Sequence, residues 1–232
     1  MKIHRKLIII VKPQYHNTRS IKLNKLVFGL LLVIVNISNA KIISSIGAQI
    51  GLNSTFQSWN YKPDDIDVMD NVDLHYNAVF SVEMFKVNHL NLFLSISYLQ
   101  KGGLDNDVIE TDALGRELGT ISDWTRLDYI CISPALRFNY RINKIDPYLI
   151  IGPSFDLMVL KEESFDKNIT DQFNEFEISL PFGVGCEYNL INNINLNLNI
   201  QFQPSITNLF KNNSLTVKNN LFKYDFGLLF QI

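Results

Sequence analysis

Eight segments of this chain carry an apolar residue at every second position, and no charge interrupts any of these eight apolar faces. Residues 194–203 give the cleanest example, because Leu, Ile and Phe alternate there with Asn and Gln. Successive side chains of a β-strand point to opposite faces, so each segment predicts a strand with one apolar and one polar face. A polar face of Asn and Gln without Lys, Glu or Asp suggests a narrow, enclosed lumen, and an unbroken apolar face suggests lipid.

The predicted strands have the length of tilted transmembrane strands, which need about 9–11 residues. They cover roughly residues 44–53, 74–85, 90–101, 127–140, 147–160, 174–188, 194–203 and 221–232. Three connections are short, and the other four are long, at roughly 54–73, 102–126, 161–173 and 206–220. Short turns on one rim and long loops on the other are typical of outer-membrane barrels, whose long loops lie outside the cell. The pattern predicts an all-β fold, an eight-stranded antiparallel up-and-down transmembrane β-barrel.

The first 40 residues differ from the rest in charge and hydropathy. They hold seven basic residues and no acidic one. The ten-residue apolar run 26–35 follows, with the small residues Ser38 and Ala40 where a signal peptidase cuts. The run is shorter than the roughly 20 residues that a membrane helix needs. We expect a secretory signal peptide over 1–40, cleaved after Ala40, and a barrel domain over 41–232; the alternative is an uncleaved anchor.

The charge balance of residues 41–232 bears on the partners. This part keeps 14 of the 21 basic residues and all 23 acidic ones, a net charge near −9, without a basic stripe. Nucleic acid is therefore excluded as a partner. We expect contact with outer-membrane lipid, a monomeric barrel, and room for an envelope protein partner at the extracellular loops.

Five tyrosines fall on apolar faces near the predicted strand ends. Three lie near the long-loop rim and two near the short-turn rim: Tyr76, Tyr98, Tyr224, Tyr140 and Tyr188. Tyrosine combines an apolar ring with a polar hydroxyl and gathers at membrane–water interfaces. The sequence therefore predicts two aromatic belts.

Prolines are the strongest argument against regular strands. Four lie inside the predicted strands or directly after one: Pro134, Pro153, Pro181 and Pro204. Each removes a backbone donor that a closed ladder would use. We expect bulges or register breaks at these positions.

Three stretches of the predicted strands share a family pattern. Residues 97–103 are Ser-Tyr-Leu-Gln-Lys-Gly-Gly and residues 147–154 are Pro-Tyr-Leu-Ile-Ile-Gly-Pro-Ser. Residues 127–140 form the third, with Ser133 as an insertion before Pro134. In these stretches the chain resembles the PorT-like outer-membrane β-barrel family of Bacteroidetes-type bacteria. The resemblance implies an eight-stranded barrel that tolerates strand prolines. It implies no activity, although it allows a role as an accessory to secretion or envelope assembly.

The predicted polar faces carry seven charged residues: Glu83, Arg137, Asp156, Glu177, Glu187, Lys223 and Asp225. Charges that face an enclosed lumen must pair or hydrate, because isolated burial is costly. The lumen of eight strands is just wide enough for side chains to fill. We expect a structural network of salt bridges around Arg137 and Lys223; the alternative is a narrow ion path or proton relay.

Three other features are compatible with chemistry but fit a structural role better. Residues 64–73 hold five carboxylates, yet lack the glycine and terminal glutamate of an EF-hand calcium loop. His75 shares a polar face with Ser81 and Glu83, and a hydrolase would need these three pre-organised. Cys131 and Cys186 fall on opposite faces of a sheet, so we expect free thiols. The sequence predicts no catalytic residue, no metal site and no cofactor.

These observations predict a barrel in the bacterial outer membrane with a structural, binding or envelope-accessory role through its extracellular loops. Three alternatives remain. A narrow small-solute channel uses the same fold, a membrane lipid hydrolase places a triad on it, and a soluble lipocalin-like barrel turns the apolar faces inward around a ligand.

Overall fold

The computed structural model describes residues 42–61, 66–68, 71–111, 114, 116–164, 171–211 and 215–232. All of them lie in the unit Ala40–Ile232. The predicted signal peptide over 1–40 lies outside the described residues. Within the described part of the chain, no helix is both long and apolar enough to span a membrane.

The regular structure of the described residues is a single antiparallel sheet of eleven strands. The strands are β1 (Ile43–Tyr61), β2 (Ile66–Val68), β3 (Asp73–Val87), β4 (Leu90–Thr111), β5 (Glu117–Asn139), β6 (Ile145–Ile151), β7 (Ser154–Glu163), β8 (Phe176–Ser179), β9 (Phe182–Ile191), β10 (Ile194–Pro204) and β11 (Leu215–Gln231). The predicted all-β antiparallel class is confirmed. β2 is a short strand that pairs with the C-terminal end of β1.

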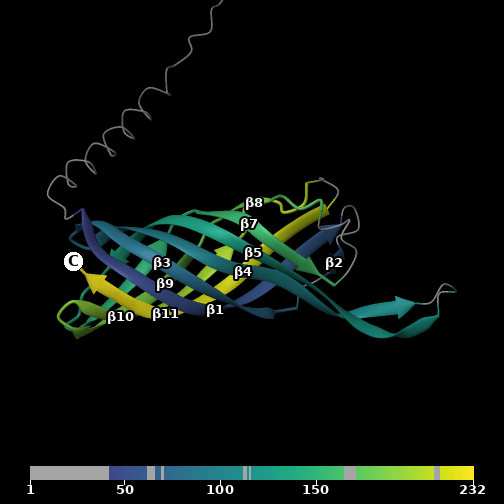
Figure 1. Cartoon of the computed structure of the whole chain (residues 1–232), viewed down its shortest axis with the longest axis horizontal. Helices are drawn as coiled ribbons and strands as arrows, with labels where there is room; N and C mark the ends of the chain where they lie inside the picture. Colours follow the sequence, from purple (N-terminus) through teal and green to yellow (C-terminus); the bar gives the residue numbers. More distant parts are fainter. Residues whose placement is uncertain are drawn as a thin grey trace, which may run out of the picture. The chain divides into compact units, whose positions relative to one another are not determined.

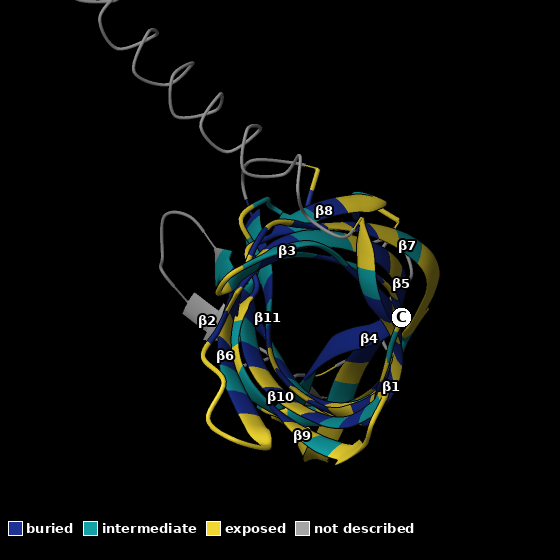
Figure 2. Ribbon diagram, turned by 90° about the vertical axis from the view of Figure 1, so that its left-hand side faces the viewer, coloured by how far each residue is buried: buried dark blue, intermediate teal, exposed yellow. Residues whose placement is uncertain are grey.

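The strand pairings return to their starting point. They run β4-β3-β1-β11-β10-β9-β6-β5, and β5 pairs with β4 again. The strands accordingly lie in a ring when seen end-on (Figure 2). β7 continues the line of β6, because β5 pairs with β7 along its first part and with β6 along its last part. β8 continues the line of β9 in the same way, because β7 pairs with β8 and β6 pairs with β9.

Two of the predicted strands are broken, as the prolines suggested. Residues 147–160 divide into β6 and β7 at Pro153, and residues 174–188 divide into β8 and β9 at Pro181. The register of β5 with β7 stops at Ile132↔Phe155 and resumes with β6 at Leu136↔Ile151. The single strands predicted over these two segments are therefore wrong in detail, because proline supplies no N–H to the ladder.

The four strand prolines stand at one level across four neighbouring strands. The register places Pro134 of β5 opposite Pro153, midway between the two pairings. On the next strand Pro181 accepts a hydrogen bond from the N–H of Gly152, and Leu180 donates to the carbonyl of Pro204. We call this row of missing backbone donors the proline row.

At the long-connection rim the strands are longer than the sequence predicts. β1 continues to Tyr61, β11 begins at Leu215, and β4 and β5 pair through most of the predicted loop 102–126. Pairing uses backbone groups, so it continues at this rim although the alternation of apolar and polar residues is lost.

The alternation of faces follows the predicted assignment over the ring. Apolar residues such as Ile50 and Phe80 are 69% and 53% exposed on the outer face, whereas Gln49 and Asn197 face inward and are buried. Figure 2 shows this as buried and exposed stripes along the strands. The lipocalin-like alternative needs the opposite arrangement, with the alternating apolar faces turned inward.

The lumen is nevertheless not polar throughout. Eleven buried residues form an apolar cluster at the long-connection end: Trp59, Leu99, Leu127, Tyr129, Cys131, Phe173, Leu209, Phe210, Leu215, Val217 and Leu221. Phe173 precedes β8 and Phe210 follows β10, and their rings pack edge-to-face 6.2 Å apart, with Trp59 5.9 Å from Phe173. We call this group the apolar cap. Burial of its side chains fills this end of the lumen.

Candidate functional site in the lumen

All seven residues predicted for the lumen network are buried. They are distributed over six strands: Glu83 on β3, Arg137 on β5, Asp156 on β7, Glu177 on β8, Glu187 on β9, and Lys223 and Asp225 on β11. The structure gathers them into separate clusters at different depths and does not form one continuous network.

The first cluster surrounds Arg137, which is fully buried. Its guanidinium forms ion pairs with Glu83 and with Glu187. The same group lies 3.5 Å from the ring centroid of Tyr148. The two carboxylates take further hydrogen bonds, of 2.7 Å each, from the Ser45 hydroxyl and the Asn195 amide. A buried cation with two carboxylates and an aromatic face meets the requirement that buried charges be paired.

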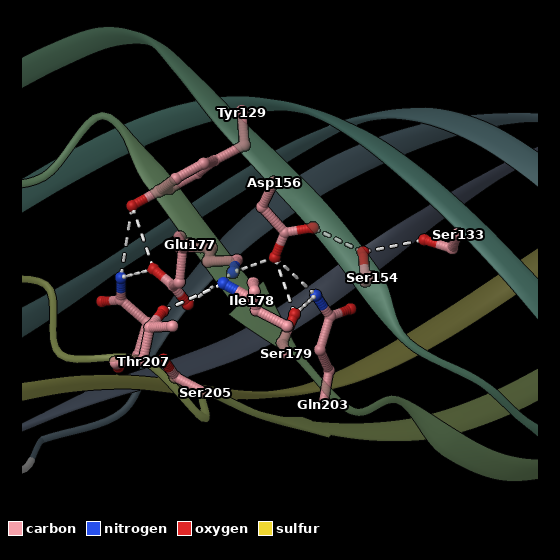
Figure 3. Close-up of polar contacts among 12 residues, drawn as sticks. Tyr129, Ser133, Ser154, Asp156, Glu177, Ile178, Ser179, Gln203, Ser205 and Thr207 are labelled. Carbon is pink, nitrogen blue, oxygen red and sulfur yellow. Dashed lines mark hydrogen bonds and ion pairs between the residues drawn. The ribbon is translucent and has the colours of Figure 1, made fainter.

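The second cluster centres on Lys101, a residue that the sequence analysis left out. Its Nζ donates to Asp156 Oδ2 at 2.7 Å and to Glu177 Oε1 at 2.9 Å. The ammonium also lies 4.7 Å from the ring centroid of Tyr129, whose hydroxyl donates to Glu177 at 3.2 Å (Figure 3). Lys101 shares strand parity with Ser97 on the polar face of β4, so the alternation could have found it.

Lys223, by contrast, is not the centre of a salt-bridge cluster. It lies 3.3 Å from Asp225, two residues along its own strand. Both residues line a cavity between the Arg137 and Lys101 clusters, together with Gln49, Ser95 and Gln201. The expected network around Lys223 is thus replaced by a single ion pair beside this cavity.

Asp156 joins a set of hydroxyl and amide groups at the proline row. It accepts from Ser154, from Ser179 at 2.7 Å and from Gln203 Nε2 at 3.1 Å, and Ser133 donates to Ser154 at 2.8 Å (Figure 3). Ser133, Ser154 and Gln203 each adjoin a proline of the row in sequence, and Ser179 lies two residues before Pro181. Side chains therefore connect β5, β7, β8 and β10 where the backbone ladder lacks donors.

The short-turn end of the lumen is polar. A pocket of about 100 Å³ opens there, lined by Arg141, Asn143, Lys144, Asp146, Glu187, Asn189 and Asn195. Asp146 is buried, with Arg141 3.5 Å from Oδ2, while its Oδ1 has no hydrogen-bond partner among the described residues. Asn91 and Asn139, buried near Arg137, also have side-chain atoms without partners in the described part of the chain. This end suits water, which can complete such hydrogen bonds.

The residues considered for hydrolysis are not brought together. His75 Nε2 lies 3.2 Å from Asp73, whereas Glu83 belongs to the Arg137 cluster. Glu83 lies eight positions after His75 on β3, which is a distance of about 26 Å in an extended strand. Among the described residues no group of three His, Cys, Asp or Glu side chains could hold a metal ion. Residues 64, 65, 69 and 70 of the acidic segment 64–73 lie outside the described residues.

The two cysteines lie as the strand parity predicts. Cys131 is buried in the lumen and pairs across the sheet with Asp156, and Cys186 pairs with Leu198 on the outer face. Both are free thiols.

The five belt tyrosines lie on the outer face. Four of them are 41–64% exposed: Tyr76, Tyr140, Tyr188 and Tyr224. The fifth, Tyr98, donates its hydroxyl to Asp128. By parity Asp128 is on the outer face, two residues before Ile130, and Arg126 pairs with it at 3.0 Å. The outer face thus carries this ion pair at its rim, and the tyrosine hydroxyl bonds to its carboxylate.

Solved outer-membrane structures resemble this chain. Neisserial surface protein A is 12% identical, with a TM-score of 0.45 over 81% of this chain and 97% of that chain. The outer membrane protein OprG from Pseudomonas aeruginosa is 12% identical, with a TM-score of 0.46 over 83% and 98%. The attachment invasion locus protein Ail of Yersinia pestis is 15% identical, with a TM-score of 0.38 over 81% and 99%.

No curated protein matches this chain in sequence. The model of one family matches residues 37–211, which is most of the chain and includes β1 to β10. The chain belongs to the family described as outer membrane protein beta-barrel domain.

Proposed function

We propose that this chain is an eight-stranded transmembrane β-barrel of a bacterial outer membrane, with a non-conducting lumen and a binding role at its long-connection end. The family, the closed order of pairings and the outward apolar faces support the barrel. The proposal includes export by a signal peptide within residues 1–40, a monomeric state and direct contact with membrane lipid.

The filled lumen is the observation that carries this proposal. The apolar cap occupies one end, and the Lys101 and Arg137 clusters cross the lumen below it. Ions in a water-filled pore need a continuous hydrated path, and packed aromatic rings and paired charges interrupt one. A protein whose interior serves as a core must act through its rims, and here the long-connection rim offers the larger surface.

Conductance tests the lumen. The purified chain is inserted in a planar bilayer at high salt, where we expect no current steps. Steady single-channel steps would instead favour the narrow solute channel, which the cavity beside Lys223 makes the second candidate.

Cysteine labelling on intact cells tests the orientation. Ser122→Cys on the long-connection side and Asn143→Cys on the short-turn side are made in a background of Cys131→Ser and Cys186→Ser. A membrane-impermeant maleimide should label position 122 directly and position 143 only after the outer membrane is permeabilised. The opposite pattern would reverse the proposed topology.

We further propose that the chain is not an enzyme, because the groups considered for a triad lie far apart on β3. Lipid A should keep its acylation pattern when the gene is deleted. If the chain were a lipid A hydrolase, its deletion would leave the substrate uncleaved and change that pattern. A role as an accessory to secretion or envelope assembly fits the same surface and the resemblance to PorT-like sequences.

A further inference from the structure

β4 and β5 continue past the ring as a two-stranded ribbon (Figure 1). The pairing of β3 with β4 stops at Asn77↔Leu99, and that of β7 with β5 stops at Thr125↔Glu163. β4 and β5 pair with each other as far as Thr111↔Glu117. We call residues 105–123 the ribbon.

The edge of β5 in the ribbon presents backbone groups outward. Trp124 donates its N–H to Ser164 Oγ at 2.8 Å and accepts from the Ser164 N–H at 3.1 Å, so its backbone groups point toward the β7 side. Backbone directions alternate along a strand. The register shift between Asp105↔Asp123 and Val108↔Ile121 places its extra residue on β4, so β5 keeps its alternation from Trp124 to Thr120. Ser122 and Thr120 therefore point their N–H and C=O groups to the same side, where no described strand pairs with them.

The ribbon is strongly acidic. Its six carboxylates are Asp105, Asp107, Glu110, Asp112, Glu117 and Asp123, against one cation, Arg116, which gives a net charge of −5. A second copy of the ribbon or an anionic lipid surface would be repelled by this charge. A basic polypeptide is attracted by it.

Exposed apolar side chains accompany the charge. Leu118 is 63% exposed and Ile121 is 43% exposed on β5, and Leu114 at the tip is 78% exposed. In strand addition the backbone bonds supply affinity, and pockets or contacts for alternate side chains supply specificity. An isolated two-stranded ribbon is only marginally stable in water, so a third strand would stabilise it.

We propose that the edge of β5 at residues 118–123 binds an extended, basic segment of a polypeptide partner by strand addition. This inference rests on the binding role proposed above and names its site and partner class. The site lies beyond the ring. Peptide binding to it can therefore be measured on the full chain in detergent, whichever side of the membrane the site faces.

A fluorescent peptide of alternating Lys, Val and Thr serves as the probe, with the full chain in detergent micelles and anisotropy as the readout. We expect saturable binding that weakens as salt rises, because the ribbon charge steers and holds the basic peptide. A matched peptide with Glu in place of Lys should not bind.

Two pairs of variants separate edge pairing from charge. Thr120→Pro removes one outward N–H, and we expect about tenfold weaker binding, whereas Thr120→Val keeps the N–H and should bind as the native chain does. Asp105→Asn with Glu117→Gln should weaken binding and flatten its salt dependence, whereas Glu162→Gln with Glu175→Gln outside the ribbon should change it little. Retained heat-modifiable mobility on gels shows that each variant is folded.

Equal binding by Thr120→Pro and Thr120→Val would overturn strand addition, and binding of the Glu peptide would overturn the charge argument. Surface labelling at position 122 reports the topology independently. If the native chain does not bind the peptide although position 122 is labelled on intact cells, this inference is rejected and the proposed orientation stands.

Discussion

The two ends of the lumen are built from different chemistry. The long-connection end holds the apolar cap, with Trp59, Phe173 and Phe210 in ring-to-ring contact. The short-turn end holds a polar pocket and several side-chain atoms that have no partner among the residues the structure describes. One end is a hydrophobic core of the kind that stabilises soluble proteins, and the other depends on charge pairing and water.

In the membrane barrel proposed above, the outer face would contact lipid, and its apolar side chains would gain little free energy from one another. The specific contacts that stabilise such a barrel must therefore lie in its interior. The cap supplies burial of apolar area, and the ion clusters supply register between strands far apart in sequence. The predictions below test the two ends separately.

The largest effect is expected at the Arg137 cluster. Arg137→Ala leaves Glu83 and Glu187 buried without their cation, and the free energy of unfolding should fall by about 4 kcal/mol. Urea titration of the refolded chain measures it. Arg141→Ala removes an exposed guanidinium at the same end and should cost less than about 1 kcal/mol. Similar losses for the two variants would mean that the polar end does not depend on the buried pair.

The cap should follow closely. Phe173→Ala removes a buried ring from the contacts with Trp59 and Phe210, and we expect a loss of about 3 kcal/mol in the same titration. Phe176→Ala, three residues later and 49% exposed on the outer face, is the control. A larger effect at Phe176 would show that outer-face contacts outweigh the cap.

A smaller loss is expected at the proline row. Asp156→Asn keeps the shape of the side chain but leaves Lys101 with Glu177 as its remaining carboxylate, and we expect a cost of about 2 kcal/mol. Ser179→Ala removes only one of the hydrogen bonds to Asp156 and should cost about 1 kcal/mol. If both variants unfold at the native urea midpoint, the side-chain connections across the row carry no stability.

The smallest effect should have the opposite sign. Pro153→Val restores a backbone donor opposite Pro134, and one added ladder bond should stabilise the chain by about 1 kcal/mol. Hydrogen exchange read by mass spectrometry should show slower exchange over residues 150–156. Pro63→Val, between β1 and β2 in the sequence, serves as a control, which should leave that exchange unchanged. Faster exchange over 150–156 would mean that Pro153 is fitted to its break.

Several elements of the fold could be predicted because the cause is local. A strand that separates lipid from lumen must alternate, so the alternation located the central part of each strand and the outward tyrosines. The same parity placed Arg137, Asp156 and Glu177 inside. Prolines at Pro153 and Pro181 mark the breaks, since a missing N–H acts on its own strand.

Other features could not be predicted, because they depend on which strands become neighbours. β4 and β5 extend through most of the predicted loop 102–126, because backbone pairing continues where the alternation of apolar and polar residues has ended. Lys101 rather than Lys223 became the partner of Asp156 and Glu177, because strand stagger sets the depth of each charge. The apolar cap joins residues from connections that carry no periodic signal.

The all-β class and the inside and outside of the central strands follow from the residue pattern, because the period of two is a property of backbone geometry. Only the folded chain establishes the pairing of the buried charges, the alignment of four prolines in one row and the closure of one end of the lumen. Each of these requires the relative shift of neighbouring strands, which is set by the packing of the whole ring.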